Sequence, residues 1–600
     1  MSISSKKEYT FSFPELSGGI NIHEAEFALS PRESPKMVNL LWQDGALNCR
    51  DGQQWLCETE AGTGYAMYKR LWQDCLLFHA GAKLWSFDIN TNELTQIRTG
   101  VPQNRGTFFE YDDYLFYKNK GGFYRIDSAM TVTAVDDPDT AYVPVTVMNA
   151  SPATGSGDFY QPENRLSPRK TVSYNADGTS YAYHLPINAA SVVEVTVNGT
   201  AVTGWTYIGG VVSFPTAPPA GQNNVKITYS KSNSPAKANI MDCRFAEVYG
   251  GTGSLAIVLA GSETQPNAYF WNGNDNISMN PSYWPMENYQ LAGDTWDAVT
   301  GFGKQQNYLA VFKEHSVGKT VMSTEEIDGR LYIDLPYQAV NAVIGCDIPW
   351  SIQLIENNLV WCSSESGVHM LLDTTEVNEN NIVCISAKVN GSAQRQGLLH
   401  AMKKADSVCS MNDSKKYYIC ADSQVWLWDY ELTPYTNPSW FYCTEIAAVD
   451  FARKDDTVYH LNPAGQLTEF VRSFSDYGKA IEKFFRFPVQ IFGGYDRLKN
   501  INSVIIATRS DTNTNIRLRY VTDYEKRYDL TDLTGYSNHL VPRDLSFRCL
   551  YGRTFSYVFR RKPKCLHVRH FAMELSNAVV GCDMSIISAQ VFFNYQGRQR

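Results

Sequence analysis

The sequence lacks several features that would assign it to a common functional class. It has no C-x-x-C pair, and its odd number of 13 cysteines is scattered along the chain, which favours reduced thiols over a disulfide framework or a zinc site. No uncharged apolar run reaches the roughly 18 residues of a membrane-spanning helix. The N-terminal MSISSKKEYTFSF also lacks the apolar core of a signal peptide. These absences predict a protein that is not inserted in a membrane and stays in the cytoplasm in which it is made.

Catalytic motifs are missing as well. The sequence contains no G-x-S-x-G elbow, no G-x-x-x-x-G-K-[ST] phosphate loop and no H-E-x-x-H zinc pair. The glycine-rich GGTGSLA at 250–256 is not followed by a helix pattern, which favours a turn over a phosphate cradle. His567 and His570 are three residues apart on an expected strand, where their side chains point to opposite faces. We therefore predict ordinary half-buried histidines there and no metal site.

Paired carboxylates give no sign of general acid and base catalysis. Glu325-Glu326 and Asp455-Asp456 lie in apparent turns, where solvated charge is the expected role. We predict that the protein is not an enzyme and binds no cofactor.

Charge is distributed unevenly along the chain. Residues 481–600 contain 19 Lys and Arg against 10 Asp and Glu, although the whole chain has a net charge of -9. The first 480 residues are therefore strongly acidic and the C-terminal part is basic. A basic surface can bind phosphate or an acidic protein neighbour, whereas an acidic one repels DNA. The alternative is that both surfaces are simply solvated.

The segment RRKPK at 560–564 is the strongest basic cluster, at an expected junction of strand and turn. It could contact DNA phosphates or an acidic neighbouring subunit. We assign the second role to its basic residues and predict that they form a subunit interface; these are Arg560, Arg561, Lys562 and Lys564.

An internal repeat organises most of the chain. The segment at 68–97 contains the pattern CLLF, turn, KLWSFD, and the segment at 106–135 repeats it as YLFY, turn, GFYRID. Weaker copies lie near 245–274, 296–322, 350–374, 408–431 and 446–471. Each unit offers three or four strands that cannot bury both faces alone, and radial stacking would bury them. The repeats predict an all-β protein with a β-propeller of about seven blades; the alternative is an irregular stack of antiparallel sheets.

Two other β patterns interrupt and follow the repeat. A Pro- and Asp-rich linker introduces alternating strands and an Asn198-Gly199 turn, which predict an inserted small β-sandwich. The segment 473–488 could form a short helix or an edge strand, and long alternating strands follow it. We predict an N-terminal strand and hairpin segment at 1–66 that joins the propeller, blades at 67–135, an inserted β-sandwich at 136–240, blades at 241–475 and a C-terminal β-sandwich at 476–600.

The N-terminal region has a further pattern. The glycine pair of SGGINI at 17–22 is followed by an M-x-N stretch and then by D-G-x-L-x-x-R-x-G. We expect SGGINI to be a strand at a blade edge or entering the assembly, and the two Asp-Gly sites to be turns that bracket a hairpin. The residues of the pattern are Met37, Asn39, Asp44, Gly45, Leu47, Arg50 and Gly52.

This pattern resembles the N-terminal signature of the tail nozzle proteins of short-tailed bacteriophages, the tail tubular protein B type. Asp51 stands where that family often has a proline. The interrupted propeller, the inserted module and the closing strands HFAMELSN and ISAQVFFNYQGR are also similar to the family.

The resemblance implies a structural virion protein of the phage tail, assembled in the host cytoplasm. Its implied partners are further copies in a homohexamer, a portal-proximal adaptor protein, tail fibre or tail tip proteins, and double-stranded DNA that passes without sequence recognition. The alternative hypothesis is a carbohydrate-binding β-propeller, an adhesin or baseplate lectin. A propeller glycosidase is a third class, disfavoured because no paired-carboxylate motif is apparent.

Overall fold

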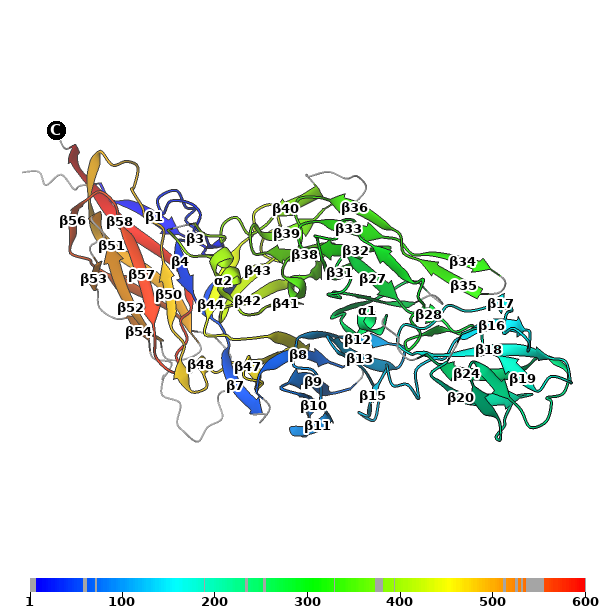
Figure 1. Ribbon diagram of the computed structural model, residues 1–600. Helices are drawn as coiled ribbons and strands as arrows, with labels where there is room; N and C mark the ends of the chain where they lie inside the picture. Colours follow the sequence, from blue (N-terminus) through cyan, green and yellow to red (C-terminus); the bar gives the residue numbers. More distant parts are fainter. Residues whose placement is uncertain are drawn as a thin grey trace, which may run out of the picture.

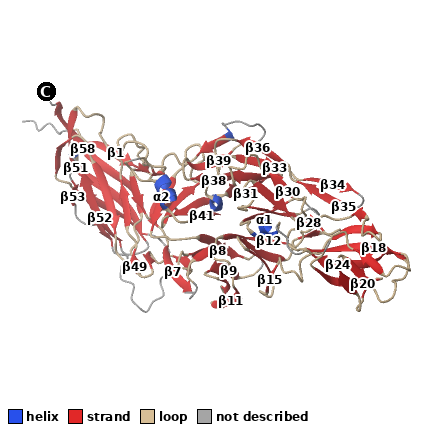
Figure 2. Cartoon of the chain, viewed as in Figure 1, coloured by secondary structure: helices blue, strands red, loops and turns tan. Residues whose placement is uncertain are grey.

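The computed structural model arranges the chain as three β-structured parts in a row, with the C-terminal sandwich and the inserted sandwich at opposite ends of a central propeller (Figure 1). Strands make up nearly all of the regular structure (Figure 2). The structure describes residues 7–57, 62–70, 73–187, 189–231, 236–251, 255–327, 330–372, 381–392, 394–510, 514–523, 527–529, 533–535 and 555–598.

The central part is a seven-bladed β-propeller, so the predicted fold class is confirmed. Blade 1 contains β8 (Gly64–Lys69), β9 (Cys75–Ala80), β10 (Lys83–Asp88) and β11 (Glu93–Thr99). Blade 2 contains β12 (Gly106–Tyr111), β13 (Tyr114–Asn119), β14 (Gly122–Ile126) and β15 (Val132–Ala134). Blade 3 contains β25 (Phe245–Tyr249), β26 (Ala256–Ala260), β27 (Ala268–Trp271) and β30 (Tyr289–Leu291), with the small hairpin β28 (Gly273–Asn274) and β29 (Met279–Asn280).

The remaining blades follow in chain order. Blade 4 contains β31 (Val299–Gln305), β32 (Tyr308–Lys313), β33 (Val317–Thr320) and β36 (Tyr337–Asn341), with the hairpin β34 (Ser323–Ile327) and β35 (Arg330–Asp334). Blade 5 contains β37 (Gln353–Ile355), β38 (Asn358–Ser363), β39 (Gly367–Leu371) and β40 (Ile382–Cys384). Blade 6 contains β41 (Val408–Asp413), β42 (Lys416–Ala421), β43 (Gln424–Asp429) and β44 (Trp440–Thr444). Blade 7 contains β45 (Asp450–Lys454), β46 (Thr457–Leu461), β47 (Leu467–Val471) and β7 (Gly52–Cys57), extended by β48 (Ser475–Asp476) and β49 (Lys479–Ala480).

Local sequence explains the blades. Several tight turns consist of two residues in the left-handed region, as two-residue hairpins of type I′ require; these are Glu356-Asn357, Ser414-Lys415 and Asp422-Ser423. The second strand of a blade is covered on both faces by neighbouring blades, and every residue of β9 and β32 is buried. This is why these strands read as continuous apolar runs rather than as alternating ones.

The ring closes through a strand that precedes the first repeat in the sequence. The first strand of each blade contacts that of the next, and β45 contacts β8. Strand β7 supplies the fourth strand of blade 7, pairing antiparallel with β47, so that Gly52 lies opposite Val471. Pairing of strands so distant in the chain makes the two ends of the propeller depend on each other.

The inserted part is a separate β-sandwich between blades 2 and 3. One sheet contains β17 (Asp158–Phe159), β16 (Val145–Ala150), β18 (Arg169–Ala176), β24 (Gly221–Ser230), β20 (Ser191–Val197) and β21 (Thr200–Ala201). The other contains β19 (Ala182–His184), β23 (Val211–Ser213) and β22 (Thr206–Ile208). The chain returns to the propeller through the short helix α1 (Lys237–Met241), and the other described helices are α2 (Leu398–Lys404) and the 3-10 turn η1 (Pro349–Ser351).

The C-terminal sandwich takes strands from both ends of the chain. One sheet contains β5 (Leu40–Gln43), β6 (Ala46–Cys49), β58 (Ile586–Arg598), β51 (Arg497–Ser510) and β55 (Phe555–Arg561), with β1 (Tyr9–Phe13) on β58 and β56 (Cys565–Val568) on β51. The other contains β4 (Lys36–Val38), β50 (Lys483–Arg486), β57 (Ala572–Asn577), β52 (Thr514–Val521), β53 (Arg527–Asp529) and β54 (Leu533–Gly535). The remaining strands β2 (Gly19–Ile20) and β3 (Glu33–Ser34) pair with each other.

This arrangement differs from the predicted domains at the N-terminus. The segment 1–66 was expected to join the propeller, but β1, β4, β5 and β6 belong to the C-terminal sandwich, and β7 and the start of β8 belong to blades. The sandwich therefore is not built from 476–600 alone. Repeat patterns cannot identify such strands, because a strand's own sequence does not specify a partner hundreds of residues away.

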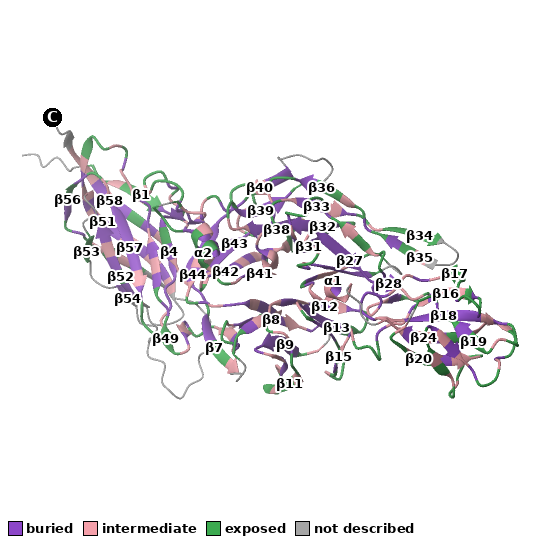
Figure 3. Ribbon diagram, viewed as in Figure 1, coloured by how far each residue is buried: buried purple, intermediate pink, exposed green. Residues whose placement is uncertain are grey.

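The two sandwiches differ in how they are joined to the propeller. The core of the inserted sandwich contains only its own residues, such as Val172, Ile227 and Tyr229. One continuous apolar core instead links the C-terminal sandwich with blades 5 and 6, and buried residues run through this junction (Figure 3). The inserted sandwich therefore has an independent core, whereas the C-terminal sandwich shares its core with the propeller.

The inserted sandwich should be removable if its base is kept. At this base, the amide of Trp284 in blade 3 donates to Oδ1 of Asn164, and the amide of Arg165 donates to the carbonyl of Trp284. The amide of Lys231 donates to the carbonyl of Pro168 over 3.1 Å, and residues 145 and 161 are hydrogen-bonded to each other. We predict that replacing 146–160 and 169–230 with short Gly/Ser loops leaves the melting temperature of the propeller unchanged. A control that replaces 140–235 also removes Asn164 and Arg165 and should lower it. Failure of the first variant to fold would contradict an independent insertion.

Three buried histidines make the propeller sensitive to acid. Burial lowers the pKa of His79 and His369 to about 4 and that of His460 to about 3. In the unfolded chain these histidines bind protons near pH 6.5, whereas in the folded chain they stay neutral to a lower pH. The stability present above pH 6.5 is therefore lost as the pH falls towards 4. We predict that the melting temperature falls by roughly 5 °C or more across this window. The fall should be shallower in His369→Gln; equal pH profiles would contradict this assignment.

Candidate functional site

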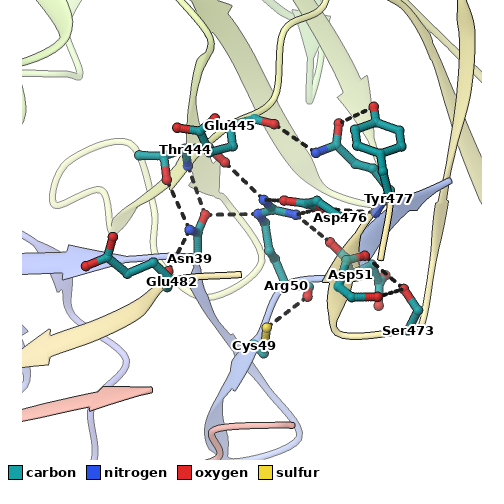
Figure 4. A network of polar contacts seen from close by, with 12 residues as sticks. Asn39, Cys49, Arg50, Asp51, Thr444, Glu445, Ser473, Asp476, Tyr477 and Glu482 are labelled. Atoms are coloured by element: carbon teal, nitrogen blue, oxygen red, sulfur yellow. Dashed lines mark hydrogen bonds and ion pairs between the residues drawn. The ribbon is translucent and has the colours of Figure 1, made fainter. Parts of the chain in front are cut away.

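Arg50 lies at the point where the chain crosses from the C-terminal sandwich to the propeller, between β6 and β7 (Figure 4). Its guanidinium forms a bidentate pair with Asp476, over 3.0 Å from Nη1 and 2.6 Å from Nη2. The remaining donors reach Oδ1 of Asn39 (2.9 Å) and the carbonyls of Asp51 (2.8 Å) and Thr444 (3.0 Å). All five N–H groups of the guanidinium therefore have an acceptor.

Asn39 connects the same point to blade 6 and to the segment at Glu482, where the chain crosses back from blade 7 to the C-terminal sandwich. Its φ of 58° places it in the left-handed region that asparagine tolerates between β4 and β5. Its Oδ1 accepts from the amide of Thr444 over 2.9 Å, and its Nδ2 donates to Oγ1 of Thr444 and to the carbonyl of Glu482. Since Glu482 directly precedes β50, Asn39 and Arg50 together hold both crossings and the end of blade 6. We call Asn39, Arg50 and Asp476 the junction clamp.

Close packing explains two of the pattern's glycines. A Cβ on Gly52 would lie 2.0 Å from the carbonyl oxygen of Ser475, so no other residue fits there. Gly19 has a φ of 73°, and a Cβ would lie 2.2 Å from the carbonyl oxygen of Trp440. The SGGINI segment thus packs directly on β44, the outer strand of blade 6, although β2 pairs with β3.

One of the two Asp-Gly expectations is correct and the other is wrong. Asp44 and Gly45 both have positive φ and form the turn between β5 and β6. Asp51 and Gly52 do not turn a hairpin, because the chain there leaves the sandwich and enters blade 7. Arg50 accounts for this difference, since its contacts hold the extended crossing in place.

The residues of the N-terminal pattern are therefore structural and lie around one junction. Met37 and Leu47 are buried in the continuous core beside the clamp. Asp476 cannot be recognised from the sequence as the partner of Arg50, because 426 residues separate the two and no motif contains the aspartate. The clamp positions two domains and offers no exposed reactive group.

A second site is the cavity on the propeller axis. It has a volume of about 390 Å³ and is lined by residues from the first strands of all seven blades. Arg105, just before β12, lies with its guanidinium 4.2 Å from the ring centre of Trp350 and donates to the carbonyl of Val408. Because blade 2 lies across the ring from these partners in blades 5 and 6, Arg105 crosses the axis at one end of the cavity. Sequence analysis did not identify Arg105.

The basic cluster lies at the edge of the C-terminal sandwich, at the end of β55 and in the turn that leads to β56. Arg560 donates to Oγ of Ser503 and lies over the ring of Phe592, while Arg561 is half-buried. Lys562 and Lys564 are exposed. The four residues share one edge, and their role in a subunit interface stays a prediction.

The other candidates do not form a catalytic arrangement. His567 is exposed on β56, and His570 is half-buried with its Nδ1 3.3 Å from Asp523. Glu325 and Glu326 lie in strand β34 and pair with Tyr332 and Leu331 of β35, so the expected turn is wrong there. Asp455-Asp456 does form a turn, between β45 and β46.

Two features are absent from the described residues. No group of three or more His, Cys, Asp or Glu residues in this part of the chain is placed to hold a metal ion. None of the described helices is both long and apolar enough to cross a membrane. Part of GGTGSLA, residues 252–254, lies outside the described residues.

Comparison with known proteins gives only distant likenesses. No family model and no curated protein matches the chain. Similar solved structures include the computationally designed Ika8 protein, at 11% identity and a TM-score of 0.30, covering 70% of this chain and 99% of that one. The Pan2 WD40 domain of Neurospora crassa has 8% identity and a TM-score of 0.31, and the match covers 72% of this chain and 96% of that domain. The AfRom2 CNH domain has 6% identity and a TM-score of 0.34, and the match covers 70% of this chain and 99% of that domain. Scores this low carry no functional inference.

Loss of the junction clamp should separate the propeller from the sandwich. Arg50→Met leaves Asp476 buried without its cation, and breaking a buried pair in this way costs about 3–5 kcal/mol. We predict that calorimetry then resolves separate unfolding transitions for the propeller and the C-terminal sandwich, which unfold together in the native chain. Lys415→Met removes the exposed pair with Glu431 and is the control, expected to have little effect. A shared, unchanged transition of these two domains in Arg50→Met would show that the clamp does not couple them.

Proposed function

We propose that this protein is a structural component of a bacteriophage tail, a nozzle or hub subunit of the distal tail tube. The observation that carries the proposal is the junction clamp. The residues by which the chain resembles the nozzle family, Asn39 and Arg50 with Gly52, hold the propeller and the C-terminal sandwich together. Such residues serve a protein whose task is to keep its domains in fixed orientation.

The proposed DNA conduit lies between subunits and not along the propeller axis. The axial cavity has a volume of about 390 Å³, and Arg105 crosses its end. Duplex DNA does not fit such a space. A ring of copies, proposed as a homohexamer, would instead surround the passage, with adaptor and tail fibre or tail tip proteins bound at its two ends.

The charge distribution suits this role. Residues 1–480 are strongly acidic, and an acidic wall does not retain phosphates, since each neutralising Lys or Arg would add salt-dependent affinity. DNA could then pass without sequence recognition. The protein in this proposal acts in the virion tail, is assembled in the host cytoplasm and catalyses no reaction.

Electron microscopy tests this function. We expect negative-stain images of the purified protein to show closed rings with a central opening wide enough for duplex DNA, and antibody against the protein to label the tail tip of virions. Soluble monomers that bind host glycans on an array would contradict the proposal and favour the carbohydrate-binding propeller.

A further inference from the structure

The hairpin β34–β35 extends from blade 4 away from the C-terminal sandwich (Figure 1). Residues 323–334 contain four acidic residues and one basic residue. Glu325 and Tyr332 are directly opposite in the hairpin, as are Ser323 and Asp334, so these side chains share one face. Tyr332 is 40% exposed, and both carboxylates are exposed. This face, with Glu325, Tyr332 and Asp334, is here called the acidic hairpin.

Within the described part of the chain, the acidic hairpin has no partner of opposite charge. Among the described residues, Glu325, Glu326 and Asp334 form no ion pair, and β34 and β35 pair only with each other. The hairpin is held on blade 3 by buried Ile333, whose carbonyl accepts from Nε1 of Trp271 over 3.1 Å. Its outer face, with an aromatic side chain among carboxylates, is well suited to bind a basic surface that also exposes apolar side chains.

The edge of the C-terminal sandwich provides such a surface. Residues 558–569 contain five Lys and Arg residues and no acidic residue. Val558 on β55 is 68% exposed and Leu566 on β56 is 64% exposed. The two strands follow one another along β51, with the exposed Lys562 and Lys564 between them. Strand β55 is at the edge of its sheet and pairs only with β51 in the described chain. We call this the basic edge.

The geometry points to the acidic hairpin of one copy of this chain as the partner of the basic edge of a second copy. The two surfaces lie at opposite ends of an elongated molecule and cannot meet within one chain (Figure 1). Each has apolar side chains beside charges of one sign, and the signs are opposite. The inference deepens the proposed homo-oligomer, on which it rests, by naming the two surfaces that meet.

A contact between two different surfaces is heterologous. Repetition of such a contact closes into a ring when the rotation allows it. It also differs from a binding site for DNA, because the basic edge would be covered by protein in the assembled ring.

Charge reversal tests the pairing on the full chain. The basic edge is reversed by Lys562→Glu with Lys564→Glu, and the acidic hairpin by Glu325→Lys with Asp334→Lys. None of these four side chains forms an ion pair in the described structure, so melting temperatures should equal that of the native protein. Sedimentation velocity should show that either variant alone associates with a dissociation constant raised by about 100-fold, because like charges then meet. Glu93→Lys and Lys226→Glu, at exposed strand positions elsewhere, are the matched controls and should associate normally.

Mixing the two variants gives the decisive result. Each variant then presents to the other a surface of opposite charge, so the mixture should recover association although each variant alone associates weakly. Normal association of each variant by itself, or no recovery on mixing, would overturn the pairing while leaving the ring intact as a proposal. A native protein that stays monomeric at every concentration would overturn both. Loss of duplex DNA binding in Lys562→Glu/Lys564→Glu with unchanged association would make the basic edge a phosphate site instead.

Discussion

The bidentate pair of Arg50 and Asp476 is the interaction on which the arrangement of this chain depends. The side chain of Arg50 is 3% exposed, and a guanidinium so far from water is tolerated only when each of its donors has an acceptor. Here the acceptors come from the N-terminal segment, blade 6 and blade 7. The same contacts that satisfy the charge therefore hold together chain segments that are distant in sequence.

This constraint explains why the propeller and the C-terminal sandwich form one unit. The N-terminal segment first contributes strands to the sandwich, passes Arg50 and then completes blade 7 as β7. The C-terminal segment leaves blade 7 and returns to the sandwich through Glu482. Since both crossings meet at Asn39, and one apolar core continues across the junction, movement of one domain would break the contacts of the other. The inserted sandwich, with its separate core, is not subject to this coupling.

The rigid connection of the propeller to the C-terminal sandwich supports the proposed role in a tail. A propeller whose axis is crossed by Arg105 contributes an outer surface and not a channel, and its seven blades fix the distance between the acidic hairpin and the basic edge. A rigid spacer with complementary ends needs little reorganisation on assembly, so less conformational entropy is lost when copies associate.

The sequence alone determined the fold class, because the repeat of short apolar strands and polar turns is local and recurs seven times. It also indicated the inserted sandwich, whose strands are contiguous and pair among themselves, and it singled out Asn39, Arg50 and Gly52 through a resemblance. It did not determine that β1, β4, β5 and β6 belong to the C-terminal sandwich, that β7 closes the ring, or that Asp476 neutralises Arg50. Those features depend on pairing between segments hundreds of residues apart. Local propensity and periodicity do not specify such partners; burial of the shared core and satisfaction of one buried charge decided them.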